Sequence, residues 1–360
     1  MKILHFLALI PLISCSSTIE KNCFESEKEK PEYVEQKPFT VKEIIENKPD
    51  YLEIVNLKKC RSFKQDSLES RHRYDSDEIL ETKWKTYQED YKIFKEKFSN
   101  QFSFSHKQQV GKRLYALGTN NLGFWLLAIE NNKPSAYFLG LSFSHYYFNE
   151  VQNQPLIKDG FLQIEGSLVQ IIKVPGLPGY DDYSAIADGK MFKVNLKELM
   201  KDTDQDGYND IFEKCFGLNP DDKDSDGDGI NDFVDVNPMY RSEKNKFTEL
   251  YEMLLPTYAG APDFKKDPYY FEVFKTDCDY FHQINPGEYK VLFIPENEDK
   301  QSYYVRFTDV CDFGISKIRK NKEFPERFYI NKWDSSSSTD YAAEYRNGKW
   351  ELEVIGGIVI

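Results

Sequence analysis

The chain has 360 residues and a formal net charge of −13, so it is long enough for two domains that each bury a hydrophobic core. Aromatic residues make up 15% of the sequence, and because such side chains favour half-buried pleated surfaces, much β-structure is expected. No basic face stands out in this acidic composition, which argues against nucleic acid as a partner.

The first residues have the pattern of a secretory signal. Lys2 precedes an apolar run, Ile3 to Ile13, that is too short to span a bilayer as a mature helix. The run ends at Leu12-Ile13-Ser14-Cys15, which resembles the lipobox of bacterial lipoproteins, whose cysteine is acylated and becomes the N-terminus. The resemblance implies a signal peptide at residues 1–14 and a protein attached by lipid at Cys15 to a membrane of the bacterial cell envelope, expected to be the outer membrane. An ordinary signal peptide with a coincidental cysteine is the alternative.

Residues 15–38 are predicted to be a lipidated, disordered tether. The stretch interleaves glutamate and lysine, and it contains too little apolar surface to offset the entropy lost on ordering. We expect it to hold the folded body away from the membrane.

Residues 39–200 are predicted to form an α+β domain of unknown function. A helix is expected to begin after Ser76, a suitable N-cap that acidic residues follow. Its apolar residues recur at steps of three and four, a stripe that is expected to face the core: Leu80, Trp84, Tyr87, Tyr91, Phe94 and Phe98. Strands are expected over residues 113–118, 124–129, 136–142, 161–164, 168–174 and 191–194, with a hairpin turn at 131–134.

Residues 241–360 are predicted to form a second, β-rich domain. A short helix is expected over residues 247–255, ended by Pro256. Strand patterns, separated by turn residues such as Asn347-Gly348, recur over residues 269–274, 289–294, 303–307, 328–330 and 350–355. A small antiparallel sheet or sandwich is therefore expected. The predicted fold class of the whole chain is α+β, with two β-rich domains joined by a short module.

Between the two domains, residues 202–238 contain one pattern twice. Each copy has carboxylates at positions 1, 3, 5, 9 and 12 of a twelve-residue loop and glycine at position 6. The first copy consists of Asp202, Asp204, Asp206, Asp210 and Glu213 with Gly207, and the second, 22 residues later, of Asp224, Asp226, Asp228, Asp232 and Asp235 with Gly229. A random acidic linker would not repeat both the acids and the glycine at the same offsets.

This spacing suits Ca²⁺, which takes about six to eight oxygen ligands. Glycine at position 6 accepts the positive φ that lets the loop turn back, and position 7, Tyr208 or Ile230, needs to supply only its backbone carbonyl. Position 12 closes the coordination shell. Because Asp235 is one methylene shorter than Glu213, the second site is expected to be tighter in shape or weaker.

The repeated pattern, with Gly217-Leu218-Asn219-Pro220 between its copies, resembles the bacterial thrombospondin type 3 repeat and, more distantly, the calcium loops of EF-hands and dockerins. The resemblance covers residues 201–240, and it implies bound calcium with a structural role between domains of a secreted or surface protein. We therefore expect calcium to convert a self-repelling acidic linker into a fixed spacer between the two domains.

The chain has six cysteines, of which five remain if Cys15 is lipidated. Cys278 and Cys311 occur in similar settings, each followed by aspartate, and form the predicted disulfide. A bond between Cys23 and Cys60 is a weaker prediction. Cys215 would then be a buried free thiol.

No catalytic motif is found: H-E-x-x-H, G-x-S-x-G and Walker-type loops are absent from the sequence, and His145 is expected to be a core histidine. The function that these patterns favour is structural or binding, in a calcium-binding lipoprotein with an unidentified protein or glycan partner. Two alternatives stay open: a hydrolase braced by structural calcium, and a calcium-dependent adhesin or glycan binder.

Overall fold

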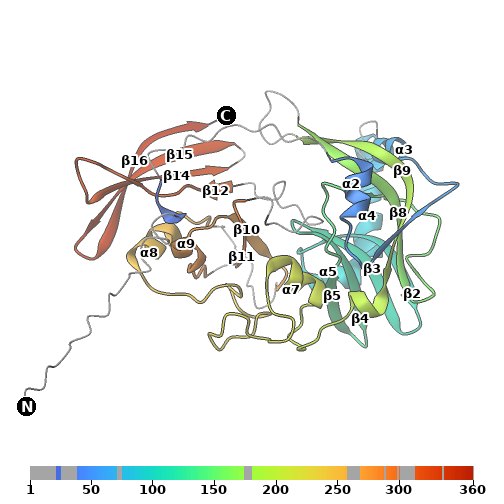
Figure 1. Cartoon of the computed structure of the whole chain (residues 1–360). Helices are drawn as coiled ribbons and strands as arrows, with labels where there is room; N and C mark the ends of the chain where they lie inside the picture. Colours follow the sequence, from blue (N-terminus) through green and yellow to red (C-terminus); the bar gives the residue numbers. More distant parts are fainter. Residues whose placement is uncertain are drawn as a thin grey trace, which may run out of the picture.

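The computed structural model describes residues 22–25, 39–70, 75–173, 181–257, 268–287, 289–297, 300, 313–334 and 336–359. Over these residues the fold is mixed and rich in strands, which agrees with the predicted α+β class (Figure 1). The strands form one parallel pair and three antiparallel sheets. No helix in the described part of the chain is both long and apolar enough to span a membrane.

The N-terminal lobe (residues 39–200) is built around two antiparallel sheets. One has the order β1-β9-β8-β6, with β7 paired to β8, and the other has the order β2-β3-β4-β5. Leu117 and Leu126 of the second sheet share a buried cluster with Leu162 and Phe192 of the first, so the two sheets pack face to face. The strands are β1 Leu52–Asn56, β2 Ser103–Val110, β3 Arg113–Asn120, β4 Gly123–Glu130, β5 Lys133–Phe138, β6 Tyr146–Phe148, β7 Ile157–Lys158, β8 Phe161–Lys173 and β9 Asp181–Asn195.

The central strand β4 of the sheet β2–β5 is buried on both of its faces. On the face turned away from the other sheet, Trp125 and Phe138 belong to a second buried cluster. Burial on both faces explains why β4 is apolar along the stretch Phe124–Ile129. The predicted hairpin turn joins β4 to β5 through Asn131 and Asn132, whose φ values of 50° and 66° are typical of a type I′ turn.

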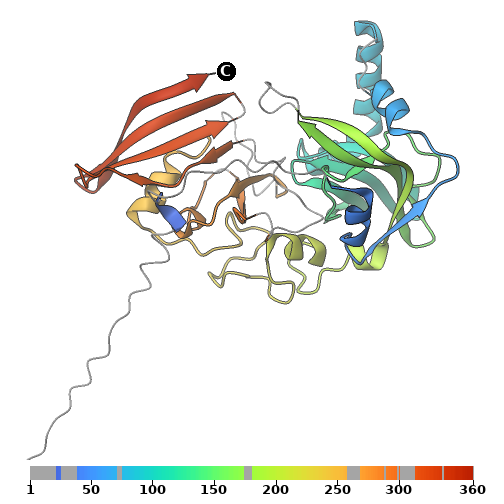
Figure 2. The ribbon, with the colours of Figure 1, turned by 45° about the horizontal axis from the view of Figure 1, so that its top comes forward.

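Helices flank these sheets: α2 Val41–Glu46, α3 Phe63–Ser70, α4 Asp77–Asp90, α5 Lys92–Phe98 and α6 Leu196–Leu199. As predicted, the Ser76 side chain caps α4 by accepting a hydrogen bond from the Ile79 backbone N–H. The predicted core-facing stripe is wrong in its first half, because the helix breaks at Tyr91 and the Trp84 side chain is 61% exposed. Figure 2 shows α4 standing away from the lobe, so the buried end of the stripe comes from α5.

The C-terminal lobe (residues 241–359) contains an antiparallel sheet of the order β12-β14-β15-β16, with β13 paired to β14. The Asn347-Gly348 turn joins β15 to β16, as predicted. Beside this sheet β10 and β11 pair in parallel, with helix α9 in the connection between them, which the sequence did not predict. The expected strand at 303–307 lies outside the described residues. The elements are α8 Lys246–Glu252, β10 Phe271–Lys275, α9 Asp279–His282, β11 Lys290–Ile294, β12 Phe313–Ile315, β13 Arg319–Lys320, β14 Arg327–Asp334, β15 Ser337–Arg346 and β16 Lys349–Val359.

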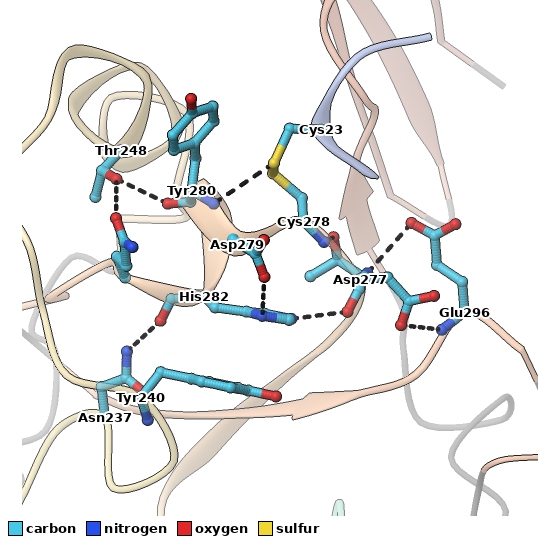
Figure 3. Close-up of polar contacts among 12 residues, drawn as sticks. Cys23, Asn237, Tyr240, Thr248, Asp277, Cys278, Asp279, Tyr280, His282 and Glu296 are labelled. Atoms are coloured by element: carbon cyan, nitrogen blue, oxygen red, sulfur yellow. Dashed lines mark hydrogen bonds and ion pairs between the residues drawn. A yellow bond between two sulfur atoms is a disulfide. The ribbon is translucent and has the colours of Figure 1, made fainter. Parts of the chain in front are cut away.

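A short segment near the N-terminus, residues 22–25, is bound to the C-terminal lobe and is termed the strap. Its Cys23 forms a disulfide with Cys278, the residue before α9 (Figure 3). Phe24 pairs with Ile318, and both Cys23 and Phe24 are buried. The prediction of a disordered tether is therefore wrong for these residues, because an aromatic side chain and a disulfide fix them in a core.

The observed disulfide also corrects the predicted pairing. Cys278 has Cys23 as its partner, so the predicted bond between Cys278 and Cys311 is wrong. The weaker prediction of Cys23 with Cys60 is wrong for the same reason, and Cys60 is a free thiol of the N-terminal lobe. The similar settings of Cys278 and Cys311 in the sequence gave no information about which residues approach them in space.

Candidate metal centre

The acidic module (residues 201–240) connects the two lobes (Figure 1), and its two loops repeat the same backbone hydrogen bonds. In each repeat the backbone N–H at position 9 donates to the carbonyl oxygen of the lysine before position 1, from Asp210 to Lys201 at 2.8 Å and from Asp232 to Lys223 at 2.9 Å. This bond closes each loop around its carboxylates. The first loop then continues into helix α7, Asp210–Phe216.

Within each loop, aspartates at positions 3 and 5 bind the backbone two residues ahead. The Asp204 carboxylate accepts from the Asp206 N–H at 3.0 Å, and the Asp206 carboxylate accepts from the Tyr208 N–H at 2.6 Å. Asp226 and Asp228 repeat both bonds in the second loop. Each carboxylate uses one oxygen in this way and keeps the other available for a ligand.

The first cluster combines carboxylates of both loops. Ligand atoms of Asp202, Asp204 and Asp206 lie within 4.8 Å of one another, and so do those of Asp206, Glu213 and Asp232. Glu213 is 0% exposed, and neither of its oxygens has a hydrogen-bond partner among the residues that the structure describes. One oxygen of Asp204 and one of Asp206 are unpartnered in the same sense. Buried polar atoms are almost always paired, so these oxygens require protons or a cation.

The second cluster consists of Asp224, Asp226 and Asp228, whose ligand atoms also lie within 4.8 Å of one another. It is more open than the first, because all three residues are half-buried. Asp235 is buried nearby but is not part of this close group. One oxygen of Asp226 and one of Asp235 lack a partner in the described part of the chain.

The two aspartates at position 9 differ in role. Asp210 is bound by the protein itself: Lys201 Nζ donates to it at 2.7 Å, and the Thr203 N–H and hydroxyl donate at 2.9 Å. Burial alone would raise the pKa of Asp210, but these hydrogen bonds lower it, and its carboxylate lies outside both close groups. Asp232 accepts the corresponding bonds from Ser225 at 2.9 and 2.6 Å, yet it lies in the first cluster. The second loop thus contributes a carboxylate to the site of the first.

Burial and mutual repulsion raise the pKa values of the clustered acids. Burial is the larger cause, and neighbouring aspartates add to it. Together they raise the pKa of Glu213 to about 8, that of Asp206 to about 7 and that of Asp226 to about 6. Without a cation, these groups therefore hold protons at a pH where ordinary carboxyl groups are ionised.

Carboxylate oxygens are the ligands that hard divalent cations prefer, so the acidic clusters could hold a metal ion. No family model matches the chain, and no curated protein or solved structure matches it. What the site binds must therefore be inferred from its own donor atoms and their burial.

Two asparagines fix the module to the lobes on either side. Asn209, at position 8 of the first loop, exchanges two hydrogen bonds of 3.0 Å with the backbone of Phe138 at the end of β5. Asn237, which follows the second loop, donates to the carbonyl oxygen of His282 at 2.7 Å (Figure 3) and to that of Ile284 at 2.9 Å. The module is therefore held by the N-terminal lobe at one end and by the C-terminal lobe at the other.

Some residues that shape the loops occur in both copies of the repeat but were not part of the predicted pattern. A lysine precedes position 1, a hydroxyl residue fills position 2 and an asparagine fills position 8 in both copies: Lys201 and Lys223, Thr203 and Ser225, Asn209 and Asn231. A longer comparison of the two copies would have found them. The buried Lys290 of the C-terminal lobe gives no such signal, because it is a lone lysine at the start of an apolar strand.

The other residues that the sequence singled out differ in how deeply they are buried. Tyr208 at position 7 is buried, whereas Ile230 at the same position of the second loop is 45% exposed. His145 is buried with its ring 4.9 Å from that of Phe39, as expected for a core histidine. Cys215 on α7 is a free thiol that is half-buried, and Cys15 lies outside the described residues.

Proposed function

We propose that the acidic module binds Ca²⁺ in both loops and that bound calcium fixes the two lobes relative to each other, in a lipid-anchored protein of the bacterial cell envelope. The observation that carries this proposal is Glu213, a fully buried carboxyl group with no partner for either oxygen in the described structure. An ionised carboxylate in such a place is strongly unfavourable unless a cation compensates its charge.

Calcium fits the donor set better than other common divalent ions. The converging ligands are carboxylates, whereas zinc favours cysteine and histidine, and Mg²⁺ is usually held by one or two carboxylates. The resemblance of the module to the thrombospondin type 3 repeat points to the same ion. The first ion would be held by Asp202, Asp204, Asp206, Glu213, the Tyr208 carbonyl and Asp232, and the second by Asp224, Asp226, Asp228, Asp235 and the Ile230 carbonyl.

The packing of the module explains why calcium would act on both lobes. Tyr208 and Phe212 stack with ring centroids 4.2 Å apart, directly beside the first cluster. Both belong to a buried cluster that also contains Trp125 of the N-terminal lobe and Phe271 of the C-terminal lobe. Ordering the first loop therefore orders side chains that touch both lobes, so the module acts as a joint with a shared core.

The proposed lipid anchor would place the C-terminal lobe nearest the membrane. Cys23, bonded to Cys278, follows Cys15 by eight positions in the sequence. At about 3.3 to 3.6 Å per residue, an extended chain of this length reaches at most about 29 Å. The N-terminal lobe would then lie farther out, held by the acidic module.

A glycan-binding role is the second candidate, favoured by one exposed aromatic residue. On β14, Tyr329 and Trp333 lie on the face opposite the buried Phe328, and Trp333 is 43% exposed. The guanidinium of Arg319 covers the Tyr329 ring at 4.9 Å, which leaves Trp333 as the open ring on this face of the strand. Sugars stack on exposed rings, but a single ring is a small platform, so this candidate ranks below the calcium joint.

Thermal unfolding of the full chain in millimolar calcium and in a chelator tests the calcium proposal. Calcium at about 100 times its Kd should stabilise the fold by about 2.7 kcal/mol per site, which raises the melting temperature. Asp206→Ala and Asp228→Ala each disable one of the two sites, so each should lose about half of the total rise and the double variant should lose nearly all of it. Asp221→Ala, an exposed acid of the module outside both clusters, is the matched control and should keep it. A wild-type chain that melts at the same temperature in both conditions would overturn the proposal.

A further inference from the structure

Lys290, the first residue of β11, is a fully buried lysine with 0% exposure. Lysine is almost never buried in this way unless it is paired. Within the described residues its ammonium forms no direct ion pair, although the charges of Asp235, Asp206 and Asp232 act on it from farther away. Its position is therefore explained by other contacts, most of which lie in the acidic module.

The ammonium of Lys290 contacts both loops at once. Its Nζ donates a hydrogen bond to the Tyr208 hydroxyl at 2.8 Å and a second one to the backbone carbonyl of Phe233. It also lies 5.2 Å, 5.0 Å and 5.9 Å from the ring centroids of Tyr208, Phe233 and Phe271. Tyr208 is position 7 of the first loop, Phe233 is position 10 of the second, and Phe271 is in β10.

Tyr208 links this contact to the first cluster. Its backbone N–H donates to the Asp206 carboxylate at 2.6 Å, so a cation that fixes Asp206 also fixes the residue whose hydroxyl Lys290 binds. We propose that Lys290 is the positioning residue that couples the two loops to each other and transmits their calcium occupancy to the parallel pair β10–β11. The proposal rests on the proposed function, since it states how calcium binding in the loops would affect the C-terminal lobe.

Other bonds join the module to the same lobe, but they hold its end. The Val291 N–H donates to the Val236 carbonyl at 2.8 Å, and Asn237 binds the backbone beyond α9. Both Val236 and Asn237 follow position 12 of the second loop. Lys290 instead reaches the interior of both loops, where calcium would change the order of the chain.

Hydrogen exchange of the full chain, measured in calcium and in a chelator, tests the coupling. In the wild type, calcium should slow exchange of β10–β11 amides at least about tenfold. In Lys290→Met, which keeps a buried side chain of similar length, the change should fall below about twofold in β10–β11 and persist in the first loop. Lys246→Met is the matched control, because Lys246 lies over three rings of the same lobe without reaching the loops, and it should behave as the wild type.

Each outcome decides between the two proposals. Calcium-dependent protection of β10–β11 that survives in Lys290→Met overturns the role of Lys290 and leaves the calcium joint standing. No calcium-dependent protection anywhere in the wild type overturns both. Lys290→Arg, which can still donate to both acceptors, should restore part of the coupling that methionine removes, and a purely structural role would not predict this rescue.

A variant that leaves Lys290 in place covers the case in which Lys290→Met does not fold. Tyr208→Phe removes only the hydroxyl that Lys290 contacts and keeps the buried ring. A clear loss of calcium-dependent protection in β10–β11 supports the proposal, and full retention overturns it.

Discussion

Glu213 shows within one residue why the acidic module must hold either protons or a cation. Its carboxyl group is fully buried and accepts no hydrogen bond from the described residues. Such a group must hold either a proton or a cation, because an isolated buried charge is much less favourable than both. The sequence identified Glu213 as position 12 of a loop. It could not show what surrounds the two oxygens of Glu213, because that depends on how the loops pack in space. Asp232, for example, joins the same cluster from the other loop.

Calcium binding should release protons near neutral pH. Without calcium the pKa of Glu213 is about 8 and that of Asp206 about 7, both far above the ordinary values of 4.5 and 3.8, so these acids are protonated in the folded chain at about pH 6. Calcium must displace these protons, and its affinity should therefore fall as the pH drops from about 8 to about 6. Titration calorimetry in buffers of different ionisation enthalpy counts the protons released. A count of zero at about pH 6 would contradict this prediction.

The same raised pKa values determine how the stability of the calcium-free chain changes with pH. Because the folded pKa values are raised above the unfolded ones, the stability that these acids contribute is present below about pH 4 and is lost as the pH rises through about 7 and about 8. Glu213→Gln should reduce the number of protons released by calcium, whereas Asp221→Ala should leave it unchanged.

At the scale of elements, the glycine at position 6 of each loop determines the backbone turn there. Gly207 and Gly229 have φ values of 121° and 97°, as predicted for position 6. Alanine at either position should cost about 1 to 3 kcal/mol in backbone strain. Gly207 carries an additional restraint, because an added Cβ would lie 2.9 Å from the Phe233 ring, whereas Gly229 faces open space.

Gly207→Ala should therefore lower both the melting temperature and the calcium affinity more than Gly229→Ala does. Chemical denaturation and calcium titration of the two variants measure the difference, and each variant serves as the control of the other. Equal losses of melting temperature and calcium affinity in the two variants would contradict this prediction, which rests on the contact of Phe233 with the first loop.

Elements with local signals were predicted, and those that depend on distant contacts were not. The Ser76 cap and the Asn131-Asn132 turn need only adjacent residues, and both were confirmed. Periodicity correctly gave an apolar side to the helix around Trp84, but it could not show that most of that side chain is left exposed. The position of Asp232 beside Glu213 likewise depends on how one loop lies against the other.

At the scale of the whole molecule, the disulfide joins residues that are far apart in the sequence. Cys23 and Cys278 are separated by 255 positions, so the N-terminal lobe and the acidic module lie between them along the chain. Similar local settings had suggested a partner within the C-terminal domain, and nothing in the sequence shows that the strap returns to α9. The helix α9 consequently has the strap at its first end and Asn237 of the module at its other end (Figure 3).

Replacing both cysteines by serine should destabilise the C-terminal lobe selectively. Removing a cross-link that closes so long a loop should lower the free energy of unfolding by about 2 to 5 kcal/mol. Hydrogen exchange should become faster in α9 and around Ile318, which pairs with Phe24, and stay unchanged in the sheet β2–β5 of the N-terminal lobe. Urea unfolding without a reductant, which keeps the wild-type disulfide intact, measures the loss, with Cys60→Ser, at a free thiol of the N-terminal lobe, as the control. Equal stability of the double variant and the control would show that the disulfide contributes nothing to the lobe, whereas a loss confined to the C-terminal lobe would show that the cross-link to the strap stabilises it.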